Sequence, residues 1–179
     1  GFWLGATPEL LLSLKDNNIS TMSLAATQSY YEGMDLNNIN WSEKEIEEQK
    51  YVSIFIKKAL EKLNIKNFSE ITKNIRAGNI IHLRTLFEFE SENEKETASK
   101  LLASINPTPA VLGTPVQESL SFILENESHK REFYCGFLGP LNINKNNSSL
   151  YVNLRCLQFY KDTAYLYIGA GIIKGSIPE

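Results

Sequence analysis

The stretch Ile80–Glu90 reads IIHLRTLFEFE, and apolar and polar side chains alternate along most of it. One set of alternate positions is apolar and the other polar: Ile81, Leu83, Phe87 and Phe89 against His82, Arg84, Glu88 and Glu90. Successive side chains of a β-strand point to opposite faces. The pattern therefore predicts a half-buried strand, with one face in a core and the other polar.

Further strands are expected on both sides of this one. Residues 1–15 predict two strands separated by a break at Thr7-Pro8, and Thr21–Ala26 predicts a third. The segments LYVNLRCLQFY (150–160) and TAYLYIGAGII (163–173) each predict one strand. Because the strands come in runs and the helices lie apart from them, the fold class is α+β, with antiparallel sheets flanked by helices.

A long helix is predicted from Ser42, which forms an S-x-x-E capping box with Glu45, to about Leu63. Its apolar positions recur at helical spacing: Val52, Phe55, Ile56, Ala59, Leu60 and Leu63. Glu48 lies at the edge of this stripe, where a carboxylate needs a cation or hydrogen bonds to offset desolvation. Magnesium is one such cation, and an arginine or lysine partner is the commoner one.

Two more helices are expected, over NEKETASKLLASI and PVQESLSFILEN, and between them lies Asn106–Pro115, NPTPAVLGTP. Thr114 with Gln117, and Pro115 at the first helical position, predict where the second of these helices begins. A linker would be polar and mobile, whereas this stretch is apolar and holds three prolines. It indicates a stiff segment that forms the wall of a site.

Composition favours one globular domain or a large piece of one, since 42% of the 179 residues are hydrophobic and 22% charged. The net charge of −3 is small, which argues against a nucleic acid partner. The sequence lacks both an apolar run of the roughly 20 residues that a membrane span needs and a signal-peptide pattern at its start, so a cytoplasmic location is predicted. Cys135 and Cys156 are expected to be buried free thiols. The chain begins inside an apolar run without Met and reads as an excerpt from a longer protein.

Three residues carry candidate chemistry. Glu9 follows the Thr-Pro break beside apolar Leu10–Leu12, a setting that raises the pKa of a carboxyl and suits a general acid; a solvated turn residue is the alternative. Arg155 is expected in the middle of a strand, where it suits bidentate carboxylate binding, in a ligand or in a structural ion pair. His82 fits equally a histidine satisfied on the face of a sheet.

Eight motifs in order resemble those of chorismate-utilising enzymes, and specifically of isochorismate synthases: FWLGATPELL, SLAAT, WSEKEIEEQ, HLRT, NPTPAVLGTP, REFYCG, LYVNLRC and YIGAGIIKGSIPE. The resemblance covers essentially the whole chain. It implies that residues 1–179 are part of a single chorismate-binding domain with the aminodeoxychorismate synthase-like fold, incomplete at both ends.

The stretch NPTPAVLGTP also separates branches of this superfamily. Isochorismate synthases resemble HPTPAVGG.P here, whereas anthranilate, aminodeoxychorismate and salicylate synthases carry a segment that ends in a lysine after the proline. This chain has Pro107–Ala110 and no lysine after Pro115, and it reads Ala26-Thr27-Gln28 in place of the GTRPRG of the ammonia-using branch.

The resemblance implies a reaction in which a lysine-activated water attacks C2 of chorismate while a glutamic acid protonates the departing C4 hydroxyl. Glu9 matches that acid, and Glu48 matches one of two glutamates that hold magnesium. Arg155, with the backbone at Gly169, matches the site of the enolpyruvyl carboxylate. The remaining matched positions line the substrate pocket: Ala26, Thr27, His82, Val111 and Tyr134. At Ala26 the family usually has glycine.

The resemblance places the general-base lysine before Gly1 and the second magnesium glutamate after Glu179. Residues 1–179 alone are therefore predicted not to turn over chorismate, although the whole enzyme would serve menaquinone or siderophore synthesis. Two other hypotheses stay open. One is a non-catalytic piece that pairs with an N-terminal part or with a second copy, and the other is an anthranilate or aminodeoxychorismate type of synthase that uses ammonia.

Overall fold

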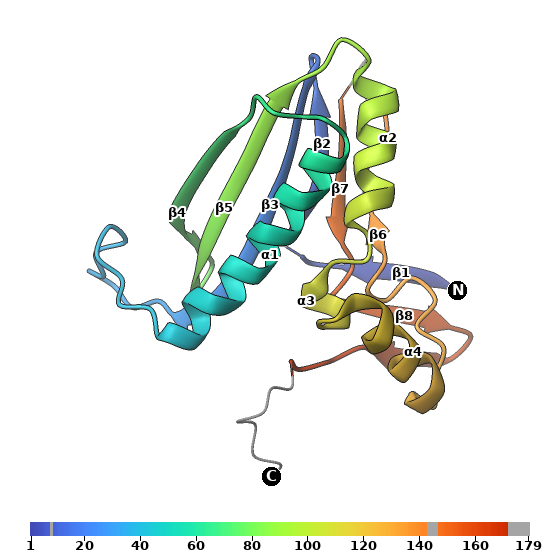
Figure 1. Cartoon of the computed structure of the whole chain (residues 1–179). Coiled ribbons are helices and arrows are strands. Elements are labelled where there is room, and N and C mark those ends of the chain that lie inside the picture. The colour runs from blue at the N-terminus through green and yellow to red at the C-terminus, as the bar shows by residue number, and fades with distance from the viewer. Residues whose placement is uncertain (8, 143–146, 172–179) are drawn as a thin grey trace.

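The larger of two sheets has the strand order β4-β5-β3-β2-β7-β6, and its neighbouring strands pair antiparallel (Figure 1). The computed structural model describes residues 1–7, 9–142 and 147–171. Within these residues the strands of this sheet are β2 (Leu10–Lys15), β3 (Asn18–Ser29), β4 (Ser69–Ala77), β5 (Ile80–Glu90), β6 (Phe137–Leu138) and β7 (Ser148–Val152). The prediction of an α+β fold with antiparallel sheets is confirmed.

The smaller sheet has the order β1-β8-β9 and consists of β1 (Phe2–Gly5), β8 (Cys156–Tyr160) and β9 (Thr163–Leu166). The prediction of one strand over residues 150–160 is wrong, because β7 and β8 belong to different sheets. Asn153 lies at the break and is buried. Its backbone N–H donates to the Gly136 carbonyl at 2.9 Å, and its side-chain amide donates to the Phe133 carbonyl at 2.9 Å. These hydrogen bonds keep β7 and β8 from forming one continuous strand. The end of the predicted strand 163–173 lies outside the described residues.

Two helices, α1 (Glu43–Lys62) and α2 (Glu94–Ile105), pack on the same face of the larger sheet (Figure 1). The predicted capping box is present: Ser42 Oγ accepts from the Glu45 N–H at 3.3 Å, and the Glu45 carboxylate accepts from the Ser42 N–H at 2.8 Å. The predicted apolar stripe of α1 is also confirmed. Its members are buried in, or packed against, one cluster with the apolar side chains of α2, β2, β3, β5 and β7.

The stretch Asn106–Pro115 contains a short helix, α3 (Pro109–Leu112), and leads into α4 (Val116–Asn126). The predicted cap is wrong by one residue. Pro115 has extended backbone dihedrals and is itself the N-cap, so α4 begins at Val116, and the Thr114 side chain does not cap it. Among the described helices, none is long and apolar enough to cross a membrane.

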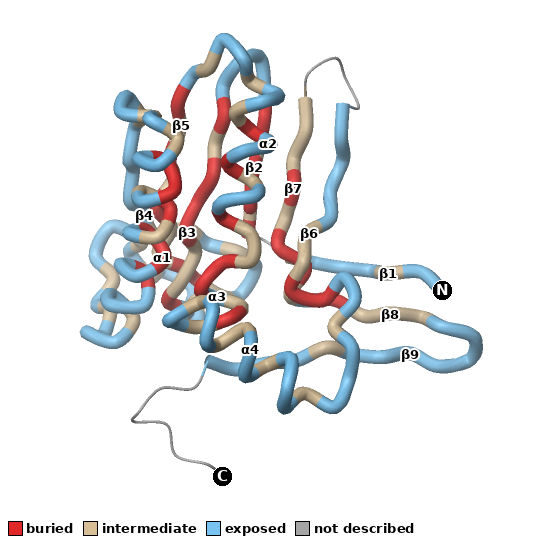
Figure 2. Tube along the Cα trace, turned by 45° about the vertical axis from the view of Figure 1, so that its right-hand side comes forward, coloured by how far each residue is buried: buried red, intermediate tan, exposed pale blue. Residues whose placement is uncertain are grey.

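Many of the buried residues lie on β2, β3, β5 and β7, whereas the residues of α4, β8 and β9 are largely half-buried or exposed (Figure 2). On β5 the predicted alternation holds for the apolar face, since Ile81, Phe87 and Phe89 are buried. His82 points to the opposite face and is nevertheless only 3% exposed. That face is therefore not a solvated face at the level of His82, contrary to the simple half-buried pattern.

A β-bulge interrupts the pairing of β3 with β5. The register runs from Ala25 opposite Leu83 to Thr27 opposite His82, which leaves Ala26 as the extra residue. Ala26 has φ 56°, in the left-handed region that glycine adopts freely and that costs other residues about 1–2 kcal/mol. The bulge changes which face of the sheet the following side chains occupy, and it brings Thr27 to the face of His82.

We expect the bulge to discriminate sharply among side chains at position 26. The free energy of unfolding of Ala26→Gly should differ by less than about 1 kcal/mol from that of the wild type. The relief of the left-handed strain is offset by the larger chain entropy of glycine in the unfolded state. Ala26→Val should lower the free energy of unfolding by about 2 kcal/mol or more, because a β-branched residue fits the left-handed backbone region poorly. Chemical denaturation measures both. Ala77→Val, at a strand position without positive φ, is the control; equal losses at positions 26 and 77 would contradict the strain argument.

Candidate functional site

Glu9 lies just before β2, at the point where the chain passes from the smaller sheet to the larger one. Its backbone carbonyl accepts from the Val152 N–H at 3.0 Å, which ties it to the end of β7. The side chain is 7% exposed, and burial raises the pKa of its carboxyl to about 7, with the Arg155 guanidinium acting in the opposite direction. The predicted rise in pKa is confirmed, and near neutral pH this carboxyl holds a proton in a large fraction of molecules.

Arg155 lies in the connection between β7 and β8, not in the middle of a strand as predicted. Its carbonyl accepts from the Ala6 N–H at 2.9 Å, so the backbone is anchored to the connection that leads to Glu9. The side chain is exposed, and among the ion pairs between described residues none involves Arg155. A guanidinium on an anchored backbone, without an ion pair among the described residues, is well suited to bind a carboxylate of a ligand.

His82 on β5 forms the third part of this group. Its Nδ1 lies 3.0 Å from Thr27 Oγ1 and 3.3 Å from the Ala26 carbonyl oxygen. Its Nε2 is buried and has no hydrogen-bond partner among the described residues. Burial lowers the pKa of the imidazole, the hydrogen bond that Nδ1 donates to the Ala26 carbonyl opposes this, and the Arg155 charge lowers the pKa further. His82 is therefore neutral near pH 7, with one ring nitrogen unused.

Tyr134, Gly169 and Val111 form a second group. A side chain at Gly169 would begin 2.7 Å from the Tyr134 hydroxyl, so only glycine fits there without displacement. The Tyr134 ring stacks on Tyr167 with centroids 4.9 Å apart, and burial raises the pKa of its phenol to about 12. Val111 in α3 is half-buried and packs against both hydrophobic clusters. This packing agrees with the prediction of a stiff wall.

Arg131, the first residue of the motif REFYCG, links the two ends of this second group. Its guanidinium pairs with the Glu127 carboxylate and donates to the Val111 carbonyl at 3.3 Å. Its charge also lies over the Tyr134 ring, 5.6 Å from the centroid. The residue therefore holds α3 against the Tyr134 segment. Two features of the sequence marked this residue: it begins the motif REFYCG, and it lies four residues after Glu127.

The prediction that Glu48 points toward a core is wrong. Its side chain is 46% exposed and lies 3.8 Å from Lys44 Nζ in an ion pair at the surface of α1. The polar residue on the buried face of the helix is its neighbour Gln49, which is 4% exposed. The 3.6-residue period puts position 49, and not 48, in line with Val52, Ser53 and Ile56 on the inner face.

The structure thus brings Glu9, Arg155 and His82 together, since the Arg155 charge acts on both of the other groups. Leu154, the chain neighbour of Arg155, packs against both hydrophobic clusters. Cys135 and Cys156 are buried free thiols in the smaller cluster, as predicted. Glu48 shares no described contact with either group, and its predicted role in metal binding stays a prediction.

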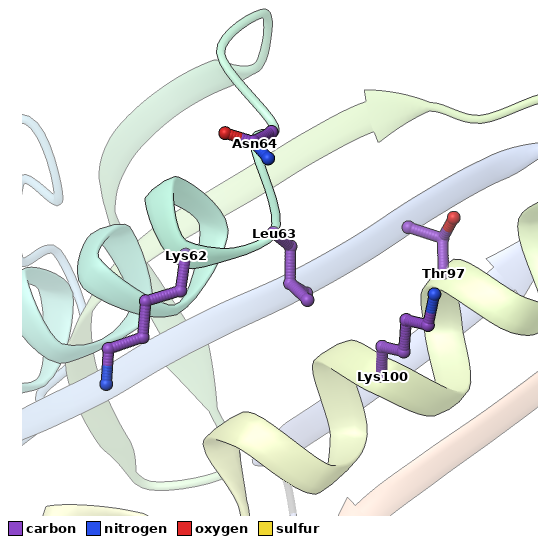
Figure 3. A pocket seen from close by; sticks show the side chains of 5 residues that line it. All are labelled: Lys62, Leu63, Asn64, Thr97 and Lys100. Carbon is purple, nitrogen blue, oxygen red and sulfur yellow. The ribbon is translucent and has the colours of Figure 1, made fainter.

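The surface of the described residues includes two hollows, and only one of the two adjoins these groups. One lies between the end of α1 and the first turns of α2 and is lined by Lys62, Leu63, Asn64, Thr97 and Lys100 (Figure 3). It contains none of the predicted site residues. The other is lined by Gly5, Ala6, Thr7, Leu138, Gly139, Tyr151 and Asn153, next to the segments that carry Glu9 and Arg155. The second hollow is the one that adjoins the candidate chemistry.

Comparisons with known proteins find relatives that are similar in sequence and in fold. Isochorismate synthase EntC of Escherichia coli strain K12 is 32% identical to this chain over 184 residues, which cover 99% of this chain and 46% of EntC. The solved structure of MenF, the menaquinone-specific isochorismate synthase from Escherichia coli, superposes with a TM-score of 0.82 at 26% identity, over 98% of this chain and 41% of MenF. Anthranilate synthase component 1 of Acetivibrio thermocellus is 27% identical over 98% of this chain and 37% of its own.

The chain spans slightly less than half the length of the curated relatives it matches. The family of chorismate binding enzymes matches residues 1–179, the whole of the sequence. The same chain has the strand order given above and the group formed by Glu9, Arg155 and His82. It belongs to the chorismate binding enzyme family.

Proposed function

We propose that the complete protein is an isochorismate synthase, which converts chorismate to isochorismate for menaquinone or siderophore biosynthesis. The observation that carries this proposal is Glu9, a buried carboxyl whose pKa is raised to about 7. The Arg155 charge acts on it, and Arg155 forms no ion pair with any residue that the structure describes. A general acid works best when its pKa lies near the working pH. The names of the relatives support the same reaction.

In the proposed reaction, the oxygen of a water molecule forms a bond to ring C2 of chorismate, and the bond from C4 to its hydroxyl breaks. The ring double bonds shift between these positions. Glu9 gives its proton to the departing hydroxyl, which leaves as water, while the attacking water loses a proton to a base that we assign to none of the described residues. Glu9 is buried and its pKa is raised to about 7, so near neutral pH a large fraction of molecules can donate this proton.

The other residues would bind and orient the substrate. Arg155 would pair with the enolpyruvyl carboxylate in bidentate fashion, together with the backbone at Gly169. Val111 and Tyr134 would form the wall of the pocket, since both are fixed by packing. His82, with Ala26 and Thr27 beside it, would contact the ring through its unused Nε2.

Magnesium belongs to this proposal through Glu48. A cation of this kind takes carboxylate and water oxygens, and when bound it would neutralise the ring carboxylate of the substrate. The Glu48 carboxylate is held only by a 3.8 Å surface ion pair and is free to turn to a cation. Within residues 1–7, 9–142 and 147–171, no three His, Cys, Asp or Glu side chains gather as a metal site. Glu48 would thus supply one ligand, and the remaining ligands would come from elsewhere.

The second candidate function is an anthranilate type of synthase, which would use ammonia. The similarity to anthranilate synthase component 1 favours it. The segments Pro107–Ala110 and Ala26-Thr27-Gln28 oppose it, because they differ from those of the ammonia-using branch. Residues 1–179 as a non-catalytic piece, alone or paired with a second copy, is a third possibility.

Chromatography of the products formed from chorismate and magnesium by the complete protein tests these readings. Isochorismate without pyruvate is the expected product, and pyruvate with anthranilate or salicylate would assign another branch. Glu9→Gln should lower kcat about 10²- to 10⁴-fold with a normal fold, because the proton donor is lost. Glu32→Gln, at an exposed loop position, is the matched control and should keep full activity. Unchanged kcat in Glu9→Gln would exclude Glu9 as the acid. Residues 1–179 alone are expected to show no turnover.

Glu9 should also shape the pH dependence of stability. Its pKa in the folded protein, about 7, lies above the value of 4.5 expected for the unfolded chain, so the folded state binds this proton more tightly. The stabilisation is complete below about pH 4.5 and is lost as the pH rises through about 7, a total of about 3 kcal/mol. Denaturation of the wild type and Glu9→Gln across this range measures the difference. Parallel curves would show that Glu9 titrates normally.

The role of Glu48 predicts a specific change in metal dependence. Glu48→Gln should raise the magnesium concentration needed for half-maximal activity by about tenfold or more, because a neutral amide is a weaker ligand than a carboxylate. Glu47→Gln, an exposed neighbour on the same helix, should leave it unchanged. Magnesium titrations of the two variants decide the matter, and equal behaviour would remove Glu48 from the metal site.

A further inference from the structure

Gln49 is a polar side chain on the buried face of α1, and each of its polar atoms is satisfied. Its Oε1 accepts from the Ala25 N–H at 2.9 Å. Its Nε2 lies 2.7 Å from Ser23 Oγ and 2.9 Å from Thr85 Oγ1. The side chain therefore connects α1 to β3 and to β5, at 4% exposure.

Most of the other buried side chains on this face of α1 are apolar, among them Val52, Ile56 and Leu60, and the exception is Ser53. A buried amide contributes little net stability compared with an apolar side chain of the same shape, although leaving its partners unpaired is costly. Packing alone therefore gives no reason for glutamine at this position. The amide provides what a leucine would not: donors for the Ser23 and Thr85 hydroxyls, and an acceptor for the Ala25 N–H next to the bulge.

Ala25 is the last residue before the β-bulge. Thr27, the first residue after it, pairs with His82 on β5. Ala26, in the left-handed conformation, directs its carbonyl oxygen to His82 Nδ1 at 3.3 Å. A carbonyl can only accept, so this contact favours the tautomer with the proton on Nδ1. The Thr27 hydroxyl, at 3.0 Å from the same nitrogen, can donate or accept and adapts to either tautomer.

We propose that Gln49 is a positioning residue that determines the tautomer of His82. By accepting the Ala25 N–H it holds the bulge, the bulge holds the Ala26 carbonyl against His82 Nδ1, and Nε2 is left as a buried hydrogen-bond acceptor. The ligand group that meets Nε2 must then be a donor, such as a ring hydroxyl. The last step rests on the proposed function; the effect on the tautomer does not.

Nitrogen-15 spectra of histidine-labelled complete protein, recorded where the imidazole is neutral, report the tautomer directly. The His82 signals are assigned by their loss in His82→Asn. We expect the Nδ1–H tautomer in the wild type. In Gln49→Leu the ratio of the two tautomers should fall about fivefold, the effect of one lost neutral hydrogen bond. If Gln49→Leu does not fold, the unbranched Gln49→Met replaces it.

Two variants separate positioning from general loosening of the core. Ser53→Ala removes a hydroxyl that lies 2.7 Å from Ser23 Oγ in the same network but does not contact Ala25, and should keep the wild-type tautomer. Gln49→Glu keeps an oxygen that accepts from the Ala25 N–H, so His82 should keep the wild-type tautomer in this variant as well. An Nε2–H tautomer in the wild type, an unchanged ratio in the apolar variant, or an equal shift in Ser53→Ala would overturn the proposal. Absence of chorismate turnover together with the expected tautomers would overturn the proposed function and leave the role of Gln49 standing.

Discussion

The antiparallel pairing of β3 with β5 is the constraint on which the rest of the structure depends. It places Ser23 and Thr85 under α1, where Gln49 joins both strands to the helix. Its register also requires an extra residue at Ala26, and that bulge puts Thr27 on the same face as His82. One face of the paired strands thus supports the core, and the other carries a buried histidine with an unused nitrogen. A shift of the pairing by one residue would exchange these two faces.

The electrostatics of the candidate site come from two groups in different surroundings. Glu9 is buried, and loss of hydration raises the pKa of its carboxyl more than the nearby positive charge of Arg155 lowers it. Arg155 is exposed, so water screens its charge and weakens its effect on Glu9. The arrangement keeps an acid that can donate a proton next to a cation that can bind an anion. A direct ion pair between them would have removed both properties.

Packing against the two hydrophobic clusters holds the rest of the site in place. Val111 and Leu154 contact both hydrophobic clusters, and Arg131 ties α3 to the segment of Tyr134. The proline-containing stretch Asn106–Pro115 is therefore not a free linker, because its short helix is held on two sides. Gly169 approaches the Tyr134 hydroxyl so closely that no other residue fits without displacement. These contacts hold the residues of the proposed wall in place.

The sequence by itself determined the local elements: the alternation of Ile80–Glu90, the capping box at Ser42 and the apolar stripe of α1 each depend on residues close together in the chain. The predicted neighbourhood of Glu9 was also local, since three leucines follow it directly. Only the tertiary structure decided the rest. Residues 150–160 look like one strand, but the two halves pair with strands distant in sequence and in different sheets. Glu48 and Gln49 are both polar, and only the orientation of α1 against β3 and β5 decides which one is buried. Contacts between distant segments have no local pattern, so the bulge, the meeting of Glu9 with Arg155 and the role of Gln49 depend on the completed fold.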